Sequence, residues 1–190
     1  MAGYIFSLDS KRSLEMYINS GVYATRIFVP NNGIWRQHQE GTWADYSTMR
    51  PGDNVYFFIK RKIYGIGKLV EINGSCKFKN FAEANRAEQF DYNEIRDSLL
   101  WDEGEKSVKQ RWICTFKPSP AFFATGIDMD DVLASNPSKF RMLRAFWKLS
   151  FIKIDDEENQ ALKDVVLQRN EDYLSGTEGG VFVSNYAEKH

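Results

Sequence analysis

The sequence predicts an α+β fold in which about six short strands form a small, partly open β-barrel surrounded by helices. Short runs rich in aromatic and β-branched residues recur along the chain, as expected for strands. Between them lie segments whose apolar residues are three and four positions apart, which is typical of helices that pack one face on a sheet. Gly65 and Gly67 fall inside one strand pattern, where glycines indicate a bulge or a sharp barrel bend.

The first elements follow from local signals. A strand is expected over residues 4–8, and either Asp9 or Ser10 can cap the helix that follows it. Gly21 is placed to end that helix, and a second strand is expected over residues 22–29. The apolar residues of the helix recur with helical spacing at Leu14, Tyr17 and Ile18.

The middle of the chain is expected to be a hairpin. Residues 34–50 show no clean period and are expected to be irregular, with at most a helical turn. The turn over residues 50–53 leads into two long strands that are joined near Arg61 and end at Ile72.

The second half is expected to alternate helices with strands. Pro118 and Pro120 are expected to end a strand, because proline cannot donate to a sheet. The expected elements are a helix over 81–98, a strand over 107–116, short helices over 128–133 and 137–146, a strand over 149–154, and a helix over 155–170.

One domain is expected over residues 1–170, with residues 171–190 as a flexible tail or a linker to a downstream domain. The basis is the polar, Gly- and Ser-containing stretch over residues 175–180, which follows the last expected helix. The sequence contains no internal repeat and no low-complexity block.

The composition bears on where the protein is located and on whether it binds a membrane or a metal. No segment is apolar over the 18 or more residues that a membrane span needs, so no membrane partner is expected. The first residues lack the features of a signal peptide, and a cytoplasmic protein is the simplest interpretation. Cys76 and Cys114 form neither a metal pattern nor a disulfide framework, and no cofactor is expected.

Charge is spread unevenly although the net charge is only −1. Residues 1–118 carry a balance of +3 and residues 119–190 a balance of −4. A protein that coats nucleic acid non-specifically has a strongly basic face, which this balance excludes. A reader that binds a single base with modest backbone contact remains compatible.

No arrangement of residues points to catalysis. His38 is the only histidine inside the chain, and no acid and nucleophile accompany it in a recognisable pattern. Gly65 and Gly67 do not form a dinucleotide-binding motif, because the third glycine is absent and no helix follows. Asp128 and its acidic neighbours lack the glycine and the terminal glutamate of a calcium loop, so they are expected to cap a helix. The chain is therefore not expected to be an enzyme.

Aromatic residues make up 15% of the chain, and most are expected in the core. Two differ from the rest. Tyr23 stands at a strand start beside the small Ala24 and Thr25, and Trp101 lies in a polar stretch among acids and a glycine. Trp101 is either part of a binding site or a satellite contact under a loop.

Four segments resemble the YTH and EVE domains of the PUA-like superfamily, as found at the start of modification-dependent, McrB-like restriction proteins. The resemblance covers somewhat over half of the chain. The segments are residues 4–25 with Gly21-Val-Tyr-Ala-Thr25, residues 55–72, Trp101 with Gln110-Arg-Trp-Ile-Cys-Thr115 and residues 118–122, and residues 136–167.

The resemblance implies an aromatic cage for a flipped, modified base. Tyr23 would be one wall, at a place where many YTH domains have tryptophan, and Trp101 would be the opposite wall. Ala24 would offer backbone atoms to the base edge. Asp9 would form a hydrogen bond with the base, and Ser13 would assist it.

The implied function is non-catalytic recognition of N6-methyladenine or a 5-modified cytosine in DNA, as the specificity module of a modification-dependent restriction system. DNA is favoured over RNA, and an NTPase or nuclease domain is expected in the full-length protein. Phosphate contacts are expected from Arg26, Lys60, Arg61 and Lys62, with a solvated hairpin turn as the alternative for the last three. A modified-RNA reader, an accessory domain of an RNA-modifying enzyme and a protein-interaction module remain open.

Overall fold

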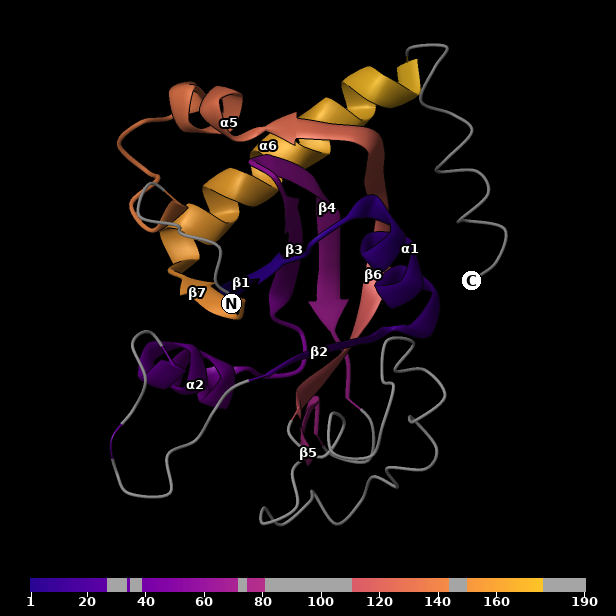
Figure 1. Ribbon diagram of the computed structural model, residues 1–190. Helices are drawn as coiled ribbons and strands as arrows, with labels where there is room; N and C mark the ends of the chain where they lie inside the picture. The colour runs from indigo at the N-terminus through magenta and orange to yellow at the C-terminus, as the bar shows by residue number, and fades with distance from the viewer. Residues whose placement is uncertain (27–33, 35–38, 72–74, 81–110, 144–149, 176–190) are drawn as a thin grey trace.

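The protein is represented by a computed structural model that describes residues 1–26, 34, 39–71, 75–80, 111–143 and 150–175 (Figure 1). The strands are β1 (Gly3–Ser7), β2 (Val22–Arg26), β3 (Asn54–Ile59), β4 (Lys62–Leu69), β5 (Lys77–Asn80), β6 (Arg111–Asp128) and β7 (Ile152–Ile154). The helices are α1 (Lys11–Ser20), α2 (Gln39–Thr48), α5 (Met129–Ser135) and α6 (Asp156–Ser175).

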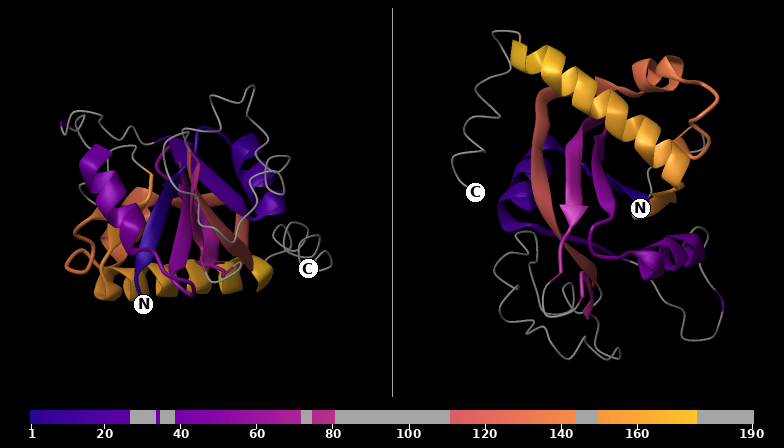
Figure 2. Two further views of the ribbon diagram at one scale, coloured as in Figure 1. Left: turned by 90° about the horizontal axis from the view of Figure 1, so that it is seen from below. Right: turned by 180° about the vertical axis from the view of Figure 1, so that it is seen from behind.

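The strands form one curled, mixed sheet in the order β2-β6-β4-β3-β1-β7, with β5 paired to β6. β1 runs parallel to β3, and the other pairs are antiparallel. Figure 2 shows α6 crossing one side of the strands, while α1 and α2 lie toward the other side. The predicted α+β fold class, a partly open barrel with helices around it, is therefore confirmed.

The period-two alternation of the strands divides the core into two parts. In β1, Tyr4 and Phe6 face the cluster that includes α1 and α2, whereas Ile5 faces the cluster beneath α5 and α6. β3 alternates in the same way, with Phe57 on the first side and Tyr56 on the second. Both faces of the central strands are buried, which explains why their sequences are apolar almost throughout.

The ends of α1 match the sequence prediction. Ser10 is the N-cap, and its hydroxyl oxygen accepts a hydrogen bond from the Ser13 amide at 3.2 Å. Gly21 adopts the left-handed conformation with a φ of 66°, and its amide donates to the Tyr17 carbonyl at 2.9 Å. This glycine turns the chain directly into β2, so α1 and β2 are held close to each other.

Two predictions about elements were wrong. Residues 39–48 form the helix α2 rather than an irregular segment, because Tyr46 and Trp43 pack as an aromatic face against Trp112. β6 continues through Pro118 to Asp128. Beyond Thr115 this strand pairs with β4 but no longer with β2 or β5, so a residue without an amide hydrogen is tolerated at its open edge.

Three further elements differ from those that the sequence predicts. Residues 137–142 form turns and bends rather than the expected helix, and a 3₁₀ turn begins at Leu143, whose amide donates to the Glu158 carboxylate at 2.9 Å. β5 was not predicted, and α6 continues to Ser175, beyond the expected end at Asn170. The helix expected over residues 81–98 lies outside the described residues.

Two glycines give a matched test of the backbone. A Cβ on Gly21 would lie 2.9 Å from the Phe116 carbonyl oxygen in addition to the strain of its positive φ, so Gly21→Ala should lower the free energy of unfolding by about 1–3 kcal/mol. Gly41 lies in α2 with nothing within 4 Å of an added Cβ, so Gly41→Ala should raise it by about 0.5–1 kcal/mol. Urea denaturation measures both, and equal effects would contradict the assigned turn.

Candidate functional site

The C-terminal end of β1 is where the predicted polar site residues come together. The Leu8 amide donates to the Phe58 carbonyl at 2.8 Å, which continues the pairing of β1 with β3 by one residue. Asp9 follows immediately and is exposed. Because the two strands are parallel, the turn that joins β3 to β4 lies at the same end of the sheet as the residues that follow β1. Figure 1 shows the course of β1, β3 and β4.

The first turn of α1 adds hydroxyl groups to this end. The Ser13 and Ser10 hydroxyls are 3.1 Å apart, so the Ser13 side chain is tied to the helix cap. The Lys11 ammonium lies 5.5 Å from the centre of the Tyr64 ring on β4, within the range of a cation–π contact. Asp9 and Ser13 are thus presented by one short segment whose position is fixed by the cap.

Tyr23 lies beneath this segment in a group of aromatic rings. Its ring stacks on Phe6 with centroids 4.3 Å apart and an interplanar angle of 14°. Tyr17 approaches it at 4.8 Å and Phe151 at 5.4 Å. Only 2% of Tyr23 is exposed.

The ring of Tyr23 is closely packed in the described structure, and its expected role as a wall of a cage stays a prediction. One face is covered by Phe6, and Tyr17 and Phe151 approach the ring from other directions. A base cannot stack on Tyr23 in this conformation without displacing a core side chain. Tyr23 is a core residue here, and its neighbourhood is the floor under the end of β1.

The hydroxyl of Tyr23 connects that floor to the polar groups above it. It donates to the Ser7 carbonyl oxygen at 3.0 Å and lies within hydrogen-bond distance of the Ser150 hydroxyl. Burial raises the pKa of Tyr23 well above its ordinary value, and the nearby Tyr17 and Asp9 act in the same direction. The phenol therefore stays protonated and holds the last residue of β1 in place.

The other predicted base-binding residues are less completely described. Ala24 is buried on β2, the last strand at one end of the described sheet, and pairs with Ile113 of β6. Its role toward a base stays a prediction. Trp101 lies outside the described residues, so the opposing wall also stays a prediction.

The basic hairpin turn has an unusual backbone. Lys60 and Arg61 have φ values of 45° and 64°, in the left-handed region that ordinarily favours glycine or asparagine. Arg61 forms an exposed ion pair with Asp130 of α5, and Lys60 is exposed. Phosphate contacts from Lys60, Arg61 and Lys62 stay predictions, as does one from Arg26, whose side chain lies outside the described part of the chain.

Within the part of the chain that the structure describes, no group of three or more histidine, cysteine, aspartate or glutamate side chains could hold a metal ion. The thiol pKa values of Cys76 and Cys114 are raised, chiefly by burial, which keeps both protonated and unreactive. None of the described helices is long and apolar enough to cross a membrane.

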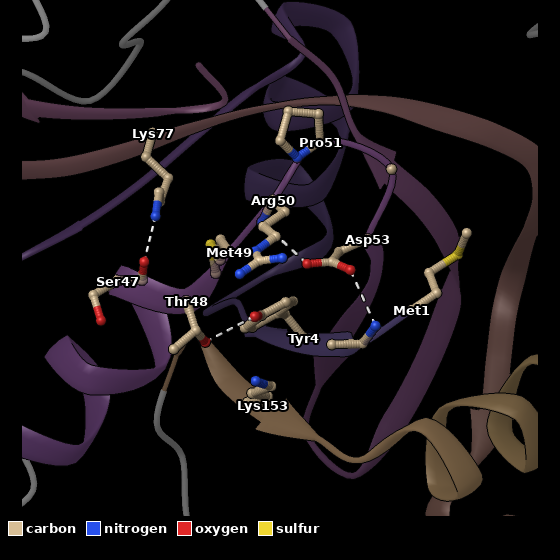
Figure 3. A pocket seen from close by; sticks show the side chains of 12 residues that line it. Met1, Tyr4, Ser47, Thr48, Met49, Arg50, Pro51, Asp53, Lys77 and Lys153 are labelled. Carbon is tan, nitrogen blue, oxygen red and sulfur yellow. Dashed lines mark hydrogen bonds between the residues drawn. The ribbon is translucent and has the colours of Figure 1, made fainter. Parts of the chain in front are cut away.

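A pocket of about 660 Å³ lies at the opposite end of β1 (Figure 3). Its lining includes the cationic side chains of Arg50, Lys77 and Lys153, which sequence reasoning did not single out. They belong to three separate parts of the chain: the turn before β3, β5 and β7. No local spacing could have joined them, because β5 itself was not predicted and β7 meets β1 only in the folded sheet.

Comparisons with known proteins find solved structures of similar fold but no match in sequence. Neither a protein-family model nor a curated protein sequence matches the chain. A hypothetical protein from Leishmania major is similar in structure, with a TM-score of 0.52 and 10% identity over 90% of this chain and 96% of that one. A protein from Rhodopseudomonas palustris has a TM-score of 0.50 and 14% identity over 88% and 94%. The MmI1 YTH domain has a TM-score of 0.44 and 6% identity over 90% and 99%.

Substitutions at Tyr23 test its assignment to the core. Tyr23→Phe keeps the stacked ring and removes only the hydroxyl, so it should cost about 1 kcal/mol of unfolding free energy. Tyr23→Ala should cost about 3–5 kcal/mol, because it leaves a cavity beside Phe6. Chemical denaturation measures both values. A loss below about 1 kcal/mol for Tyr23→Ala would show that the ring is an exposed wall after all.

Proposed function

We propose that the protein binds nucleic acid and recognises a modified base at the C-terminal end of β1, without catalysing a reaction. One observation carries the proposal: the parallel pairing of β1 with β3 brings Asp9, Ser13 and the basic turn at residues 60–62 to one end of the sheet, above an aromatic floor. Acceptors and hydroxyls suit the polar edge of a base, and cations suit its phosphates.

The energetics of base recognition match what such a site offers. A base that leaves the stack costs a few kcal/mol, and stacking on an aromatic side chain returns about 1–3 kcal/mol. Burial of a methyl group adds about 0.8 kcal/mol. Apolar contact alone therefore favours the modified base over the unmodified base by only a small free energy. Polar groups such as Asp9 must select which base binds.

The proposed roles combine the positions of the described side chains with what the resemblance to YTH domains implies. Asp9 accepts hydrogen bonds from the base edge, and Ser13 assists from the first turn of α1. Trp101 supplies the stacking wall, as the resemblance to YTH domains implies. Tyr23 has a supporting role. Its hydroxyl donates to the Ser7 carbonyl and so holds in place the end of β1, which leads into Asp9. Ala24 contributes backbone atoms from β2.

The ligand we propose is DNA that carries N6-methyladenine or a 5-modified cytosine. The resemblance of residues 4–25 and 55–72 to YTH and EVE domains supports this choice, and it extends the proposal to a specificity module in a modification-dependent restriction system. An NTPase or nuclease domain in the full-length protein would then carry out the reaction. Tighter binding to modified RNA than to modified DNA would instead assign the chain to RNA recognition.

Substitutions of Trp101 and Asp9 test the base site. Trp101→Ala should weaken binding to a modified oligonucleotide by about 1–3 kcal/mol through lost stacking, with little change in melting temperature. Asp9→Asn should reduce the preference for the modified base over other bases, because the acceptor pattern changes. Fluorescence anisotropy with matched modified and unmodified strands measures both effects. Unaltered affinity in both variants would show that the base does not bind at the end of β1.

The hairpin turn should bind phosphate rather than the base. Lys60→Ala should weaken modified and unmodified DNA by similar factors and lower the salt slope by about 0.9 on duplex or 0.7 on a single strand. Lys62→Ala should act alike. Arg61→Ala is the matched comparison: its guanidinium is already paired with Asp130, so its loss should have the smaller effect. A loss confined to the modified strand would show that the turn reads the base.

A further inference from the structure

The pocket at the N-terminal end of β1 has the chemistry of an anion site. Its volume of about 660 Å³ lies within the range of small-molecule sites. Figure 3 shows the side chains of Arg50, Lys77 and Lys153 around it. Asp53 is the only acidic residue among those that line it in the described structure, so positive charge exceeds negative charge.

The single carboxylate of the lining, that of Asp53, accepts hydrogen bonds from two backbone amides. One oxygen of Asp53 accepts the Ala2 amide at 3.0 Å, and the other accepts the Arg50 amide at 3.0 Å. Asp53 is only 8% exposed. It therefore fixes the turn between α2 and β3 against the start of β1, and its single negative charge offsets only part of the charge of the three cations.

The three cationic side chains have few partners of opposite charge among the described residues. Within the described residues, neither Arg50 nor Lys153 forms a salt bridge, and the Lys77 ammonium donates to the Ser47 carbonyl. An ammonium has three donors, so Lys77 keeps further hydrogen-bonding capacity. The Asp45 carboxylate accepts the Lys153 amide at 3.0 Å, and it also attracts the charge of the Lys153 side chain.

Like charges face one another across this pocket. Burial lowers the pKa of the Lys77 ammonium, and the positive charge of Arg50 adds to that effect. Tyr4 forms the inner end of the pocket and is anchored through its hydroxyl to Thr48 at 3.0 Å. An anion between Arg50 and Lys77 would replace this repulsion with charge-assisted hydrogen bonds.

We infer that this pocket is a second binding site, specific for a phosphate group, held by Arg50, Lys77 and Lys153. It is separate from the proposed base site, because none of its lining residues lies at the C-terminal end of β1. The phosphate belongs either to a nucleic-acid strand or to a free nucleotide. Both sources present the same oxygens to the same three cations.

Calorimetric titration of the full chain with inorganic phosphate, at constant ionic strength, tests the site. Wild-type protein should show saturable, single-site binding with a Kd of about 1 mM or tighter. Lys77→Gln and Lys153→Ala should each weaken it by roughly tenfold or more, since each removes a charged donor. Lys77→Arg should retain binding, because it keeps the charge in place.

Arg169→Ala is the matched control, because it removes an exposed positive charge from α6, away from the pocket. It should leave phosphate binding unchanged. Melting temperatures of all variants exclude unfolding as the cause of any loss, and Lys77→Arg remains informative if Lys77→Gln does not fold. Absence of saturable binding to wild-type protein, or equal affinity in the folded pocket variants and the control, would overturn the site.

Oligonucleotides without a modified base identify the source of the phosphate. A strand with a 5′-phosphate that binds more tightly than its 5′-hydroxyl counterpart, with the difference lost in Lys153→Ala, would assign the pocket to a strand end. Equal binding of both strands, together with competition between a mononucleotide and inorganic phosphate, would assign it to a free nucleotide. Phosphate binding can fail while base recognition at the other end of β1 persists, and the reverse also holds.

Discussion

The parallel pairing of β1 with β3 is the constraint on which the rest of the structure depends. In the sheet, β1 lies between β3 and the last strand, β7, and both of its faces are buried. Parallel strands need a long connection, which here contains α1, β2 and α2. That connection brings the cap of α1 to one end of β1 and the turn after α2 to the other. The two candidate binding sites lie at the two ends of β1, and the second also requires β5 and β7.

The aromatic cluster sets a limit on how a base could bind. Phe6, Tyr17, Tyr23 and Phe151 pack closely, and the burial of Tyr23 contributes to the stability of the fold. A side chain that fills the core in this way cannot also present a free face to a ligand. In the proposed site, recognition at the end of β1 would therefore rely on Asp9, Ser13 and a wall from another segment, with Tyr23 as support.

Local signals predicted much of the fold. The cap at Ser10, the left-handed Gly21 and the join between β3 and β4 were all legible, because each depends on residues that are close in the sequence. The helix α2 was missed because its apolar face is made of aromatic residues that meet Trp112, far along the chain. The sequence predicted too early an end for β6, because a proline usually ends a strand. It does not do so here, since one edge of β6 is unpaired at Pro118, and the sequence does not show this.

The candidate sites were predicted less well for a related reason. Asp9 and Ser13 follow from the resemblance of residues 4–25 to YTH domains, and their role toward a base stays a prediction. The burial of Tyr23 depends on Phe151 and Ser150, which lie more than a hundred positions away, and no spacing reveals such contacts. Arg50, Lys77 and Lys153 meet only after the sheet has formed.

The most direct test of the central claim is to locate where a modified base binds. In an isotope-labelled sample titrated with an oligonucleotide that carries N6-methyladenine, the backbone amides of residues 9–13 and 23–24 should shift strongly and saturate. The unmodified strand should produce much weaker changes there, while the amides of residues 60–62 respond to both strands. Identical shifts with the two strands, or no change at residues 9–13, would contradict recognition of a modified base at the end of β1.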